Sequence, residues 1–179
     1  LNEADPGNPD IIEIQNVSSS PVDVTGWRVI ISNSYTDINL SKLAEVSEKY
    51  GAEIISGESI YDMEMDIYSP CALGSTLNTN TINRLKCKII AGSANNQLSD
   101  EVVHGKMIKD KGIVYAPDFL INAGGLINVY SEINGYKREE SLLQTKKIYD
   151  TTLEILLKSE AEDITTHKAA LLIAEQRIQ

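Results

Sequence analysis

The sequence predicts an α/β fold built on a parallel sheet. Two observations carry this prediction: short apolar runs of four or five residues recur along the chain, and longer stretches of helical periodicity separate them. The runs are nearly continuous in apolar residues, which is typical of parallel strands that are buried on both faces. Two amphipathic helices are expected to close the chain, and a short β hairpin to open it.

The first 27 residues differ from the rest. "DIIEIQNV" and "VDVTGW" each alternate weakly between apolar and polar residues, and "SSSP" separates them. Two short strands joined by a turn-rich loop are therefore expected here.

From Arg28 onward the pattern predicts strands in alternation with helices. The expected strands are "VIIS", "AEIIS", "MDIYSP", "KIIAG" and "IVYAP". The expected helices cover residues 40–51, 81–87, 100–112, 124–135, 139–162 and 166–178. Gly51 and Gly112 are expected to end two of them, and Thr165 or Thr166 to cap the last.

Composition restricts the function classes. Asp and Glu number 26 against 16 Lys and Arg, a net charge of -10 that disfavours nucleic acid or an anionic membrane as partner. No apolar run is long enough to span a bilayer. Cys71 and Cys87 are too few for a disulfide framework, and reduced thiols in a cytoplasmic protein are favoured over a bridge. His104 and His167 lack metal-ligand spacing, so no metal site is expected.

Polar, small and glycine residues follow four of the predicted strands. The segments are "NSYTDIN", "SPCALGS", "SANNQL" and "DFLINAGGLIN". Ligands of open parallel sheets bind beyond the carboxyl ends of the strands, and small residues let the backbone approach a ligand. The sequence therefore predicts a ligand site built from these strand ends.

The polar residues in these segments also have structural explanations. Asn95 and Asn96 are consistent with turn chemistry, and Asn122 with a helix N-cap ahead of two glycines. Asp118 follows Ala-Pro and is consistent with a simple turn acid. Cys71 has no base nearby in the sequence, which favours a small packing residue over a nucleophile.

Four motifs carry a resemblance to a known family. They are "DIYSPCALGSTLN", "CKIIAGSANNQL", "GIVYAPDFLINAGGLINVYSE" and "IYDTTLEILLKSE", in that order. They resemble the coenzyme-binding half of the glutamate, leucine, phenylalanine and valine dehydrogenases, its branched-chain members above all. The resemblance implies a partial Rossmann-like, NAD-binding domain over residues 28–135 and C-terminal helices over 136–179. It also implies an enzyme that interconverts an L-amino acid with its 2-oxo acid and ammonia by hydride transfer, in a family of oligomers.

The resemblance also implies roles for cofactor-binding residues. An acid at Asp37 would bind the adenosine ribose and repel a 2′-phosphate, which favours NAD over NADP. Ala72 and Leu73 would pack beside the adenosine. Asn95 and Asn96 would lie at the nicotinamide ribose and the substrate, and Asn122 would contact the nicotinamide carboxamide.

Leu126 and Val129 correspond to the family's pocket for the substrate side chain. Both are aliphatic, so the resemblance implies an aliphatic L-amino acid such as leucine rather than glutamate.

The chain departs from the family in two ways. No G-x-G-x-x-G lies about 20 residues before Asp37, where only Gly7 and Gly26 occur, and the family's catalytic lysine and aspartate find no match. We therefore predict no catalytic residue in this chain and no turnover by the chain alone.

Residues 1–27 are similar to the opening strands of a lamin-tail domain, through "IIEIQN", "SSSPVDV" and "GW". This second resemblance leaves an alternative function open: a non-catalytic binding or adhesion module in a chimeric or truncated chain. The hairpin could then cover an exposed edge of the parallel sheet.

Overall fold

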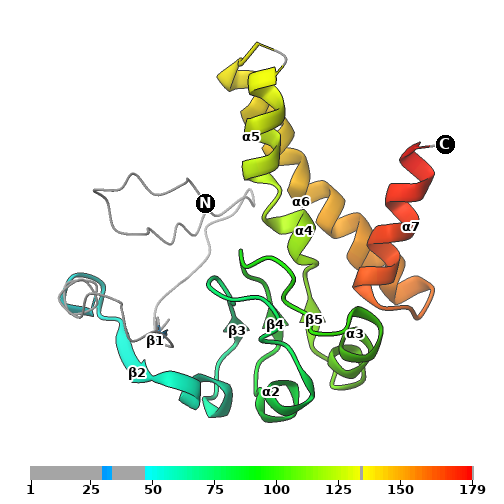
Figure 1. The fold of residues 1–179 in the computed structure, drawn as a ribbon. Helices are drawn as coiled ribbons and strands as arrows, with labels where there is room; N and C mark the ends of the chain where they lie inside the picture. Colours follow the sequence, from blue (N-terminus) through cyan, green and yellow to red (C-terminus); the bar gives the residue numbers. More distant parts are fainter. Residues whose placement is uncertain (1–29, 34–46, 134, 179) are drawn as a thin grey trace, which may run out of the picture. The chain divides into compact units, whose positions relative to one another are not determined.

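A computed structural model describes residues 30–33, 47–133 and 135–178 of the chain (Figure 1). The described residues up to Met63 belong to one compact unit, and those from Glu64 onward belong to another. The expected N-terminal hairpin, Asp37 and most of the helix expected over 40–51 lie outside the described residues.

The first unit contains a pair of parallel strands. β1 (Ile30–Asn33) pairs with β2 (Glu53–Ser56), and Ile31 lies opposite Ile54. Residues 47–50 are helical, and Gly51 follows with φ of 63°, the left-handed conformation that commonly ends a helix. A 3-10 helix, η1 (Gly57–Asp62), comes next and was not expected from the sequence.

The second unit contains a three-stranded parallel sheet. Its strands are β3 (Ile67–Tyr68), β4 (Ile89–Ile90) and β5 (Val114–Tyr115), in the order β3-β4-β5. The connections run through α2 (Thr79–Arg84) and α3 (Glu101–Asp110). Parallel strands with helical crossovers confirm the predicted α/β class.

The sheet of the second unit is buried on one face and open on the other. Tyr68, Ile90 and Tyr115 lie in register across the strands and are at most 6% exposed. The preceding residues Ile67, Ile89 and Val114 are also in register, but are 38–47% exposed. Successive right-handed crossovers in one direction place their helices on the same face. The expectation that both faces are buried is therefore wrong for these strands.

The helices of this unit begin at side-chain caps. Asn78 accepts hydrogen bonds from the backbone nitrogens of residues 80 and 81 and forms a capping box with Thr81. Asp100 caps α3 in the same way through the nitrogens of residues 102 and 103. At the far end of α2, the Lys111 ammonium donates to the carbonyls of residues 82, 83 and 85. These contacts satisfy helix ends that would otherwise lack hydrogen bonds.

Four helices complete the chain: α4 (Asp118–Ile121), α5 (Gly124–Ile133), α6 (Arg138–Ala161) and α7 (Thr166–Ile178). The sequence predicts all of these except α4, a single turn between Pro117 and the glycines. Ile155 of α6 packs with Ala169, Ala170 and Ile173 of α7. The Thr165 hydroxyl accepts from the nitrogen of Lys168 at 3.2 Å, so Thr165 is the cap of α7.

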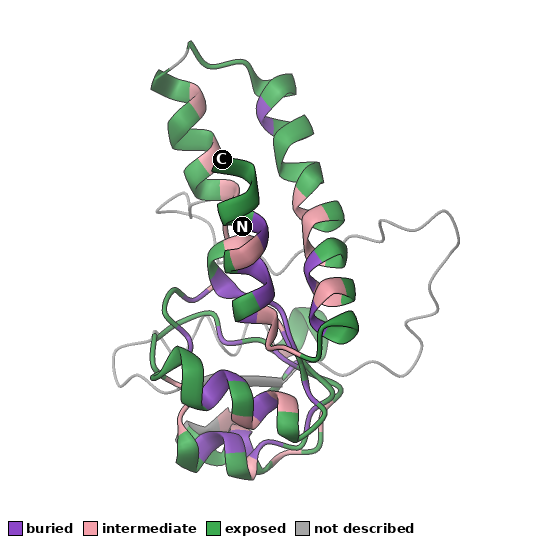
Figure 2. Ribbon diagram, turned by 90° about the vertical axis from the view of Figure 1, so that its right-hand side faces the viewer, coloured by how far each residue is buried: buried purple, intermediate pink, exposed green. Residues whose placement is uncertain are grey.

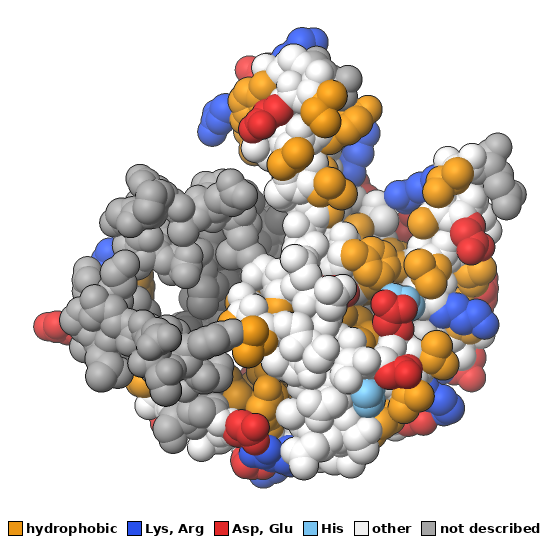
Figure 3. Space-filling view, in the orientation of Figure 1, with side chains coloured by type: hydrophobic (Ala, Val, Ile, Leu, Met, Phe, Trp, Pro, Cys, Tyr) orange, Lys and Arg blue, Asp and Glu red, His pale blue; other side chains and the backbone are white. Residues whose placement is uncertain are grey.

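α5 packs against α6 but buries none of its own residues. Figure 2 shows buried residues concentrated around the sheet and the junction of α6 with α7, and mostly exposed residues along the α5–α6 pair. Figure 3 shows hydrophobic side chains on the outer surface of these two helices. Among the described residues, no helix is both long enough and apolar enough to cross a membrane.

Candidate functional site

The carboxyl ends of β3, β4 and β5 lie at the same edge of the sheet, because the strands are parallel and in register. Residues 69–75, 91–97 and 116–122 follow these strands (Figure 1). Three of the four segments that the sequence predicts to bind a ligand are thus brought together. The fourth contains Asp37 and lies outside the described residues.

Backbone contacts fasten the first two of these loops to each other. The nitrogen of Ala94 donates to the carbonyl of Pro70 at 2.9 Å, and the nitrogen of Ser75 donates to the carbonyl of Asn96 at 2.7 Å. A Cβ placed at Gly74 would lie 2.8 Å from the carbonyl oxygen of Asn95, closer than side chains tolerate. The glycine therefore permits an approach that the cross-loop hydrogen bonds require.

The loop after β5 is held to the loop after β4 by a hydrogen bond between two asparagines, Asn122 and Asn95. The Asn122 carboxamide donates to Asn95 Oδ1 at 2.6 Å and to the carbonyl of Ser93 at 3.3 Å. A carbonyl can only accept, so Ser93 fixes which end of Asn122 is nitrogen, and Asn122 then fixes the orientation of Asn95. The pair is left with an acceptor, Asn122 Oδ1, and a donor, Asn95 Nδ2.

This contact gives the Asn122 side chain a structural role other than a helix N-cap. The residue is the C-cap of α4, and its side chain reaches the β4 loop instead of capping the start of α5. The geometry agrees with a polar group held at the strand ends. The contact joins Asn95 and Asn122, two of the residues that the sequence predicts to bind the cofactor.

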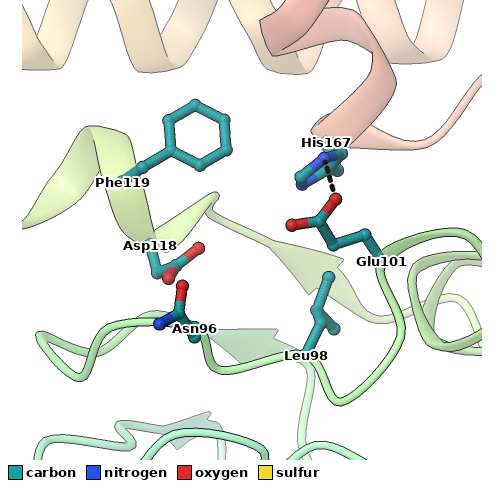
Figure 4. A pocket seen from close by; sticks show the side chains of 6 residues that line it. All are labelled: Asn96, Leu98, Glu101, Asp118, Phe119 and His167. Carbon is teal, nitrogen blue, oxygen red and sulfur yellow. Dashed lines mark ion pairs between the residues drawn. The ribbon is translucent and has the colours of Figure 1, made fainter.

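Asn96 and Asp118 line a small cavity of about 50 Å³ (Figure 4). Asn96 has φ of 51°, in the left-handed region that Asn tolerates. Asp118 is buried and accepts from the Tyr115 hydroxyl at 3.2 Å, so it is not a simple turn acid. Burial and the nearby Asp118 charge raise the pKa of Tyr115 well above its usual value, which keeps the phenol protonated.

On another side, His167 of α7 lines this cavity. His167 Nε2 lies 3.2 Å from a carboxylate oxygen of Glu101, and the Phe119 ring meets the imidazole edge-on at 5.5 Å between centroids. The cavity therefore links the C-terminal helices to the sheet. Within the described part of the chain, no group of three or more His, Cys, Asp or Glu residues could hold a metal ion.

The remaining predicted residues are exposed. Ala72 and Leu73 lie in the β3 loop, with Leu73 45% exposed. Leu126 and Val129 lie one turn apart on α5, which begins two residues after Asn122, and are 73% and 54% exposed.

Cys71 is exposed, contrary to the expected packing role, and its sulfur lies 3.2 Å from the Ser69 hydroxyl. Partial burial raises the pKa of this thiol, but hydrogen bonds from Ser69 and Ser93 outweigh it, so the net pKa is below the ordinary 9.0. Cys87 is buried, and burial raises its pKa above that value.

We expect Cys71 to react with iodoacetamide much faster than Cys87. The thiolate is the nucleophile, so Cys71 should reach half its maximal rate below pH 9.0, whereas Cys87 should stay slow throughout. Mass spectrometry of the labelled chain between pH 6 and 10 measures both rates. Equal rates for the two thiols in the folded chain would contradict this prediction.

Comparison with known proteins identifies the family. The family model of the glutamate, leucine, phenylalanine and valine dehydrogenases matches residues 27–178. The chain belongs to this family. It is 49% identical over 144 residues to a leucine dehydrogenase of Thermoactinomyces intermedius, covering 80% of this chain and 39% of that protein. It is 46% identical over 149 residues to a phenylalanine dehydrogenase of Bacillus thermotolerans, and this match also covers 80% of this chain and 39% of that protein.

A solved structure agrees with this assignment. The crystal structure of L-tryptophan dehydrogenase from Nostoc punctiforme superposes with a TM-score of 0.79 at 45% identity, covering 84% of this chain and 44% of that one. The chain spans about two fifths of the length of the curated relatives it matches. The predicted family and fold class are thereby confirmed.

Sequence reasoning missed one residue of the site. Gln97 is fully buried directly after the two predicted asparagines and donates to the carbonyls of residues 92 and 94. The sequence carries no signal that separates this residue from an exposed amide, because its partners are backbone carbonyls.

Proposed function

We propose that this chain is the cofactor-binding half of an NAD-dependent amino-acid dehydrogenase that performs oxidative deamination. Family membership supports the reaction class, and the asparagine pair at the strand ends supports the cofactor. A nicotinamide bound there would accept the hydride that an amino acid loses when it is oxidised to the 2-oxo acid.

The single observation that carries the cofactor proposal is the polarity of the asparagine pair. A primary carboxamide such as that of nicotinamide has one acceptor oxygen and one donor nitrogen. Asn122 Oδ1 could accept from that nitrogen, and Asn95 Nδ2 could donate to that oxygen. The contact to Ser93 holds both amides in this orientation before any cofactor binds.

Asp37 is proposed to bind the adenosine ribose and to favour NAD over NADP. Ala72 and Leu73 are proposed to pack beside the adenosine, where the β3 loop offers small or apolar exposed side chains. Asn96 is proposed to face the nicotinamide ribose and the substrate.

The substrate is proposed to be an L-amino acid with an apolar side chain, leucine or another branched-chain residue. Leu126 and Val129 present aliphatic side chains on one side of α5, immediately after the asparagine site. A carboxylate against these two side chains would lose hydration with no compensating partner. The sequence offers no lysine in the family's catalytic setting, so catalysis is proposed to come from the family's substrate domain. Assembly as a homo-oligomer also stays a prediction.

A titration with NAD tests the cofactor proposal directly. We expect binding by isothermal calorimetry in the micromolar range, about -8 kcal/mol, and weaker binding of NADP. Changing Asn122→Asp removes both donated hydrogen bonds and should weaken NAD binding about tenfold, by about 1.4 kcal/mol.

The matched control is Asn83→Asp on the exposed end of α2, which adds the same charge away from the strand ends. It should bind NAD as the unchanged chain does. Undetectable binding by a folded, unchanged chain would refute the cofactor role. Supplying the substrate domain of a relative in trans and finding no NADH formation with leucine would refute the activity.

A further inference from the structure

We propose that Gln97 is a positioning residue for the nicotinamide-binding asparagine pair, an inference that rests on the proposed cofactor role. The residue is fully buried and lies one position after Asn96. Its carboxamide donates to the carbonyl of Gly92 at 2.6 Å and to the carbonyl of Ala94 at 2.9 Å. The buried side chain thus links two backbone carbonyls of the loop that follows β4.

The two carbonyls that Gln97 binds are the ones on either side of Ser93. Both acceptors are carbonyl oxygens, so the amide nitrogen must face them and the orientation of the side chain is determined. Holding the carbonyls of Gly92 and Ala94 inward leaves the Ser93 carbonyl directed at the Asn122 amide, 3.3 Å away. Gln97 therefore selects which carbonyl of the loop meets Asn122.

The outside of the same loop makes backbone hydrogen bonds to neighbouring segments. Ala94 donates to Pro70, Ser75 donates to Asn96, and Leu77 donates to the carbonyl of Gln97 at 3.0 Å. These bonds fix where the loop runs, but leave the direction of the carbonyls at 92 and 94 to be set from within. Among the contacts described for residues 92–97, the Gln97 amide is the side chain that does this.

The other end of this amide shows that its orientation is imposed. Gln97 Oε1 is buried and has no hydrogen-bond partner within the described part of the chain. A buried acceptor without a donor is unfavourable, and a flipped amide would relieve nothing because its oxygen would then face two carbonyls. The two donated bonds therefore outweigh the unpaired oxygen.

The test replaces the donor while preserving the shape of the side chain. Gln97→Met keeps the length and removes both hydrogen bonds. Gln97→Glu places an oxygen against the two carbonyls when ionised, but restores one donor when protonated. Gln144→Met, on the exposed surface of α6, is the matched control.

The primary readout is hydrogen exchange of the Asn122 side-chain amide, observed by ¹⁵N NMR and assigned by its loss in Asn122→Asp. In Gln97→Met we expect exchange about tenfold faster, because the contact to Ser93 and Asn95 opens. In Gln97→Glu the amide should be unprotected at high pH and regain protection as the introduced carboxyl protonates. A side chain that only fills space would show no such pH-dependent recovery.

NAD binding is the second readout. We expect the dissociation constant to rise about tenfold in Gln97→Met and to stay unchanged in Gln144→Met. Unchanged protection of the Asn122 amide in a folded Gln97→Met, or in Gln97→Glu at high pH, would overturn the positioning role. If the unchanged chain binds no NAD, the proposed function fails, while the amide exchange still decides what Gln97 does.

Discussion

Changing Gly92→Ala is expected to destabilise the second unit by about 3 kcal/mol and to abolish NAD binding. An added Cβ would overlap the carbonyl oxygen of Pro70 and lie 2.5 Å from its nitrogen. The atoms it meets are the backbone and the ring of Pro70 in the neighbouring loop, which cannot move without breaking the bond from Ala94 to Pro70. The same carbonyl of Gly92 accepts from Gln97, so the asparagine site shifts with it.

The measurement is urea unfolding followed by circular dichroism, combined with an NAD titration of the folded variant. The control is Gly105→Ala in α3, where an added Cβ would find its nearest neighbours at 3.8 Å, an ordinary contact. Alanine also forms helices better than glycine, so this change should stabilise the chain by about 0.5–1 kcal/mol. A Gly92→Ala chain with unchanged stability and affinity would contradict the close packing of the two loops.

The strand ends could be located from the sequence because periodicity and chain order are enough for that purpose. Short apolar runs between helical stretches define parallel strands, and the carboxyl ends of parallel strands meet at one edge. Local signals also placed the helix ends: Gly112 adopts φ of 72° after α3, and Thr165 caps α7. Each of these features depends on residues close together in the chain.

The contacts inside the site could not be predicted in the same way. Asn95 and Asn122 are 27 positions apart, and nothing in either segment indicates which atoms of the two amides meet. Gln97 could not be distinguished from an exposed polar residue, because its partners are backbone carbonyls that carry no sequence signal. The roles of Asp37, Leu126 and Val129 stay predictions.

The open face of the sheet was also beyond sequence reasoning. Ile89 and Ile90 are identical residues on one short strand, so no pattern distinguishes the buried side from the exposed side. The difference arises from tertiary structure, because both crossover helices of the second unit follow the same right-handed rule.

The same pair of residues provides the second large prediction. Changing Ile90→Ala is expected to lower the free energy of unfolding by about 3–4 kcal/mol, because its side chain is 0% exposed and the change leaves a cavity. Changing Ile89→Ala should cost about 1 kcal/mol, because that side chain is 38% exposed. Urea unfolding of both variants measures the difference.

The two variants control for each other. Both exchange isoleucine for alanine in one strand, so the loss of β propensity is similar and the difference isolates burial on the two faces. A cost for Ile89→Ala as large as that for Ile90→Ala would mean that another surface covers Ile67, Ile89 and Val114 in solution. Adding the substrate domain of a relative in trans separates two sources of such cover. If only the complemented chain shows the larger cost, the added domain buries the open face; if the isolated chain shows it already, the chain buries that face by itself.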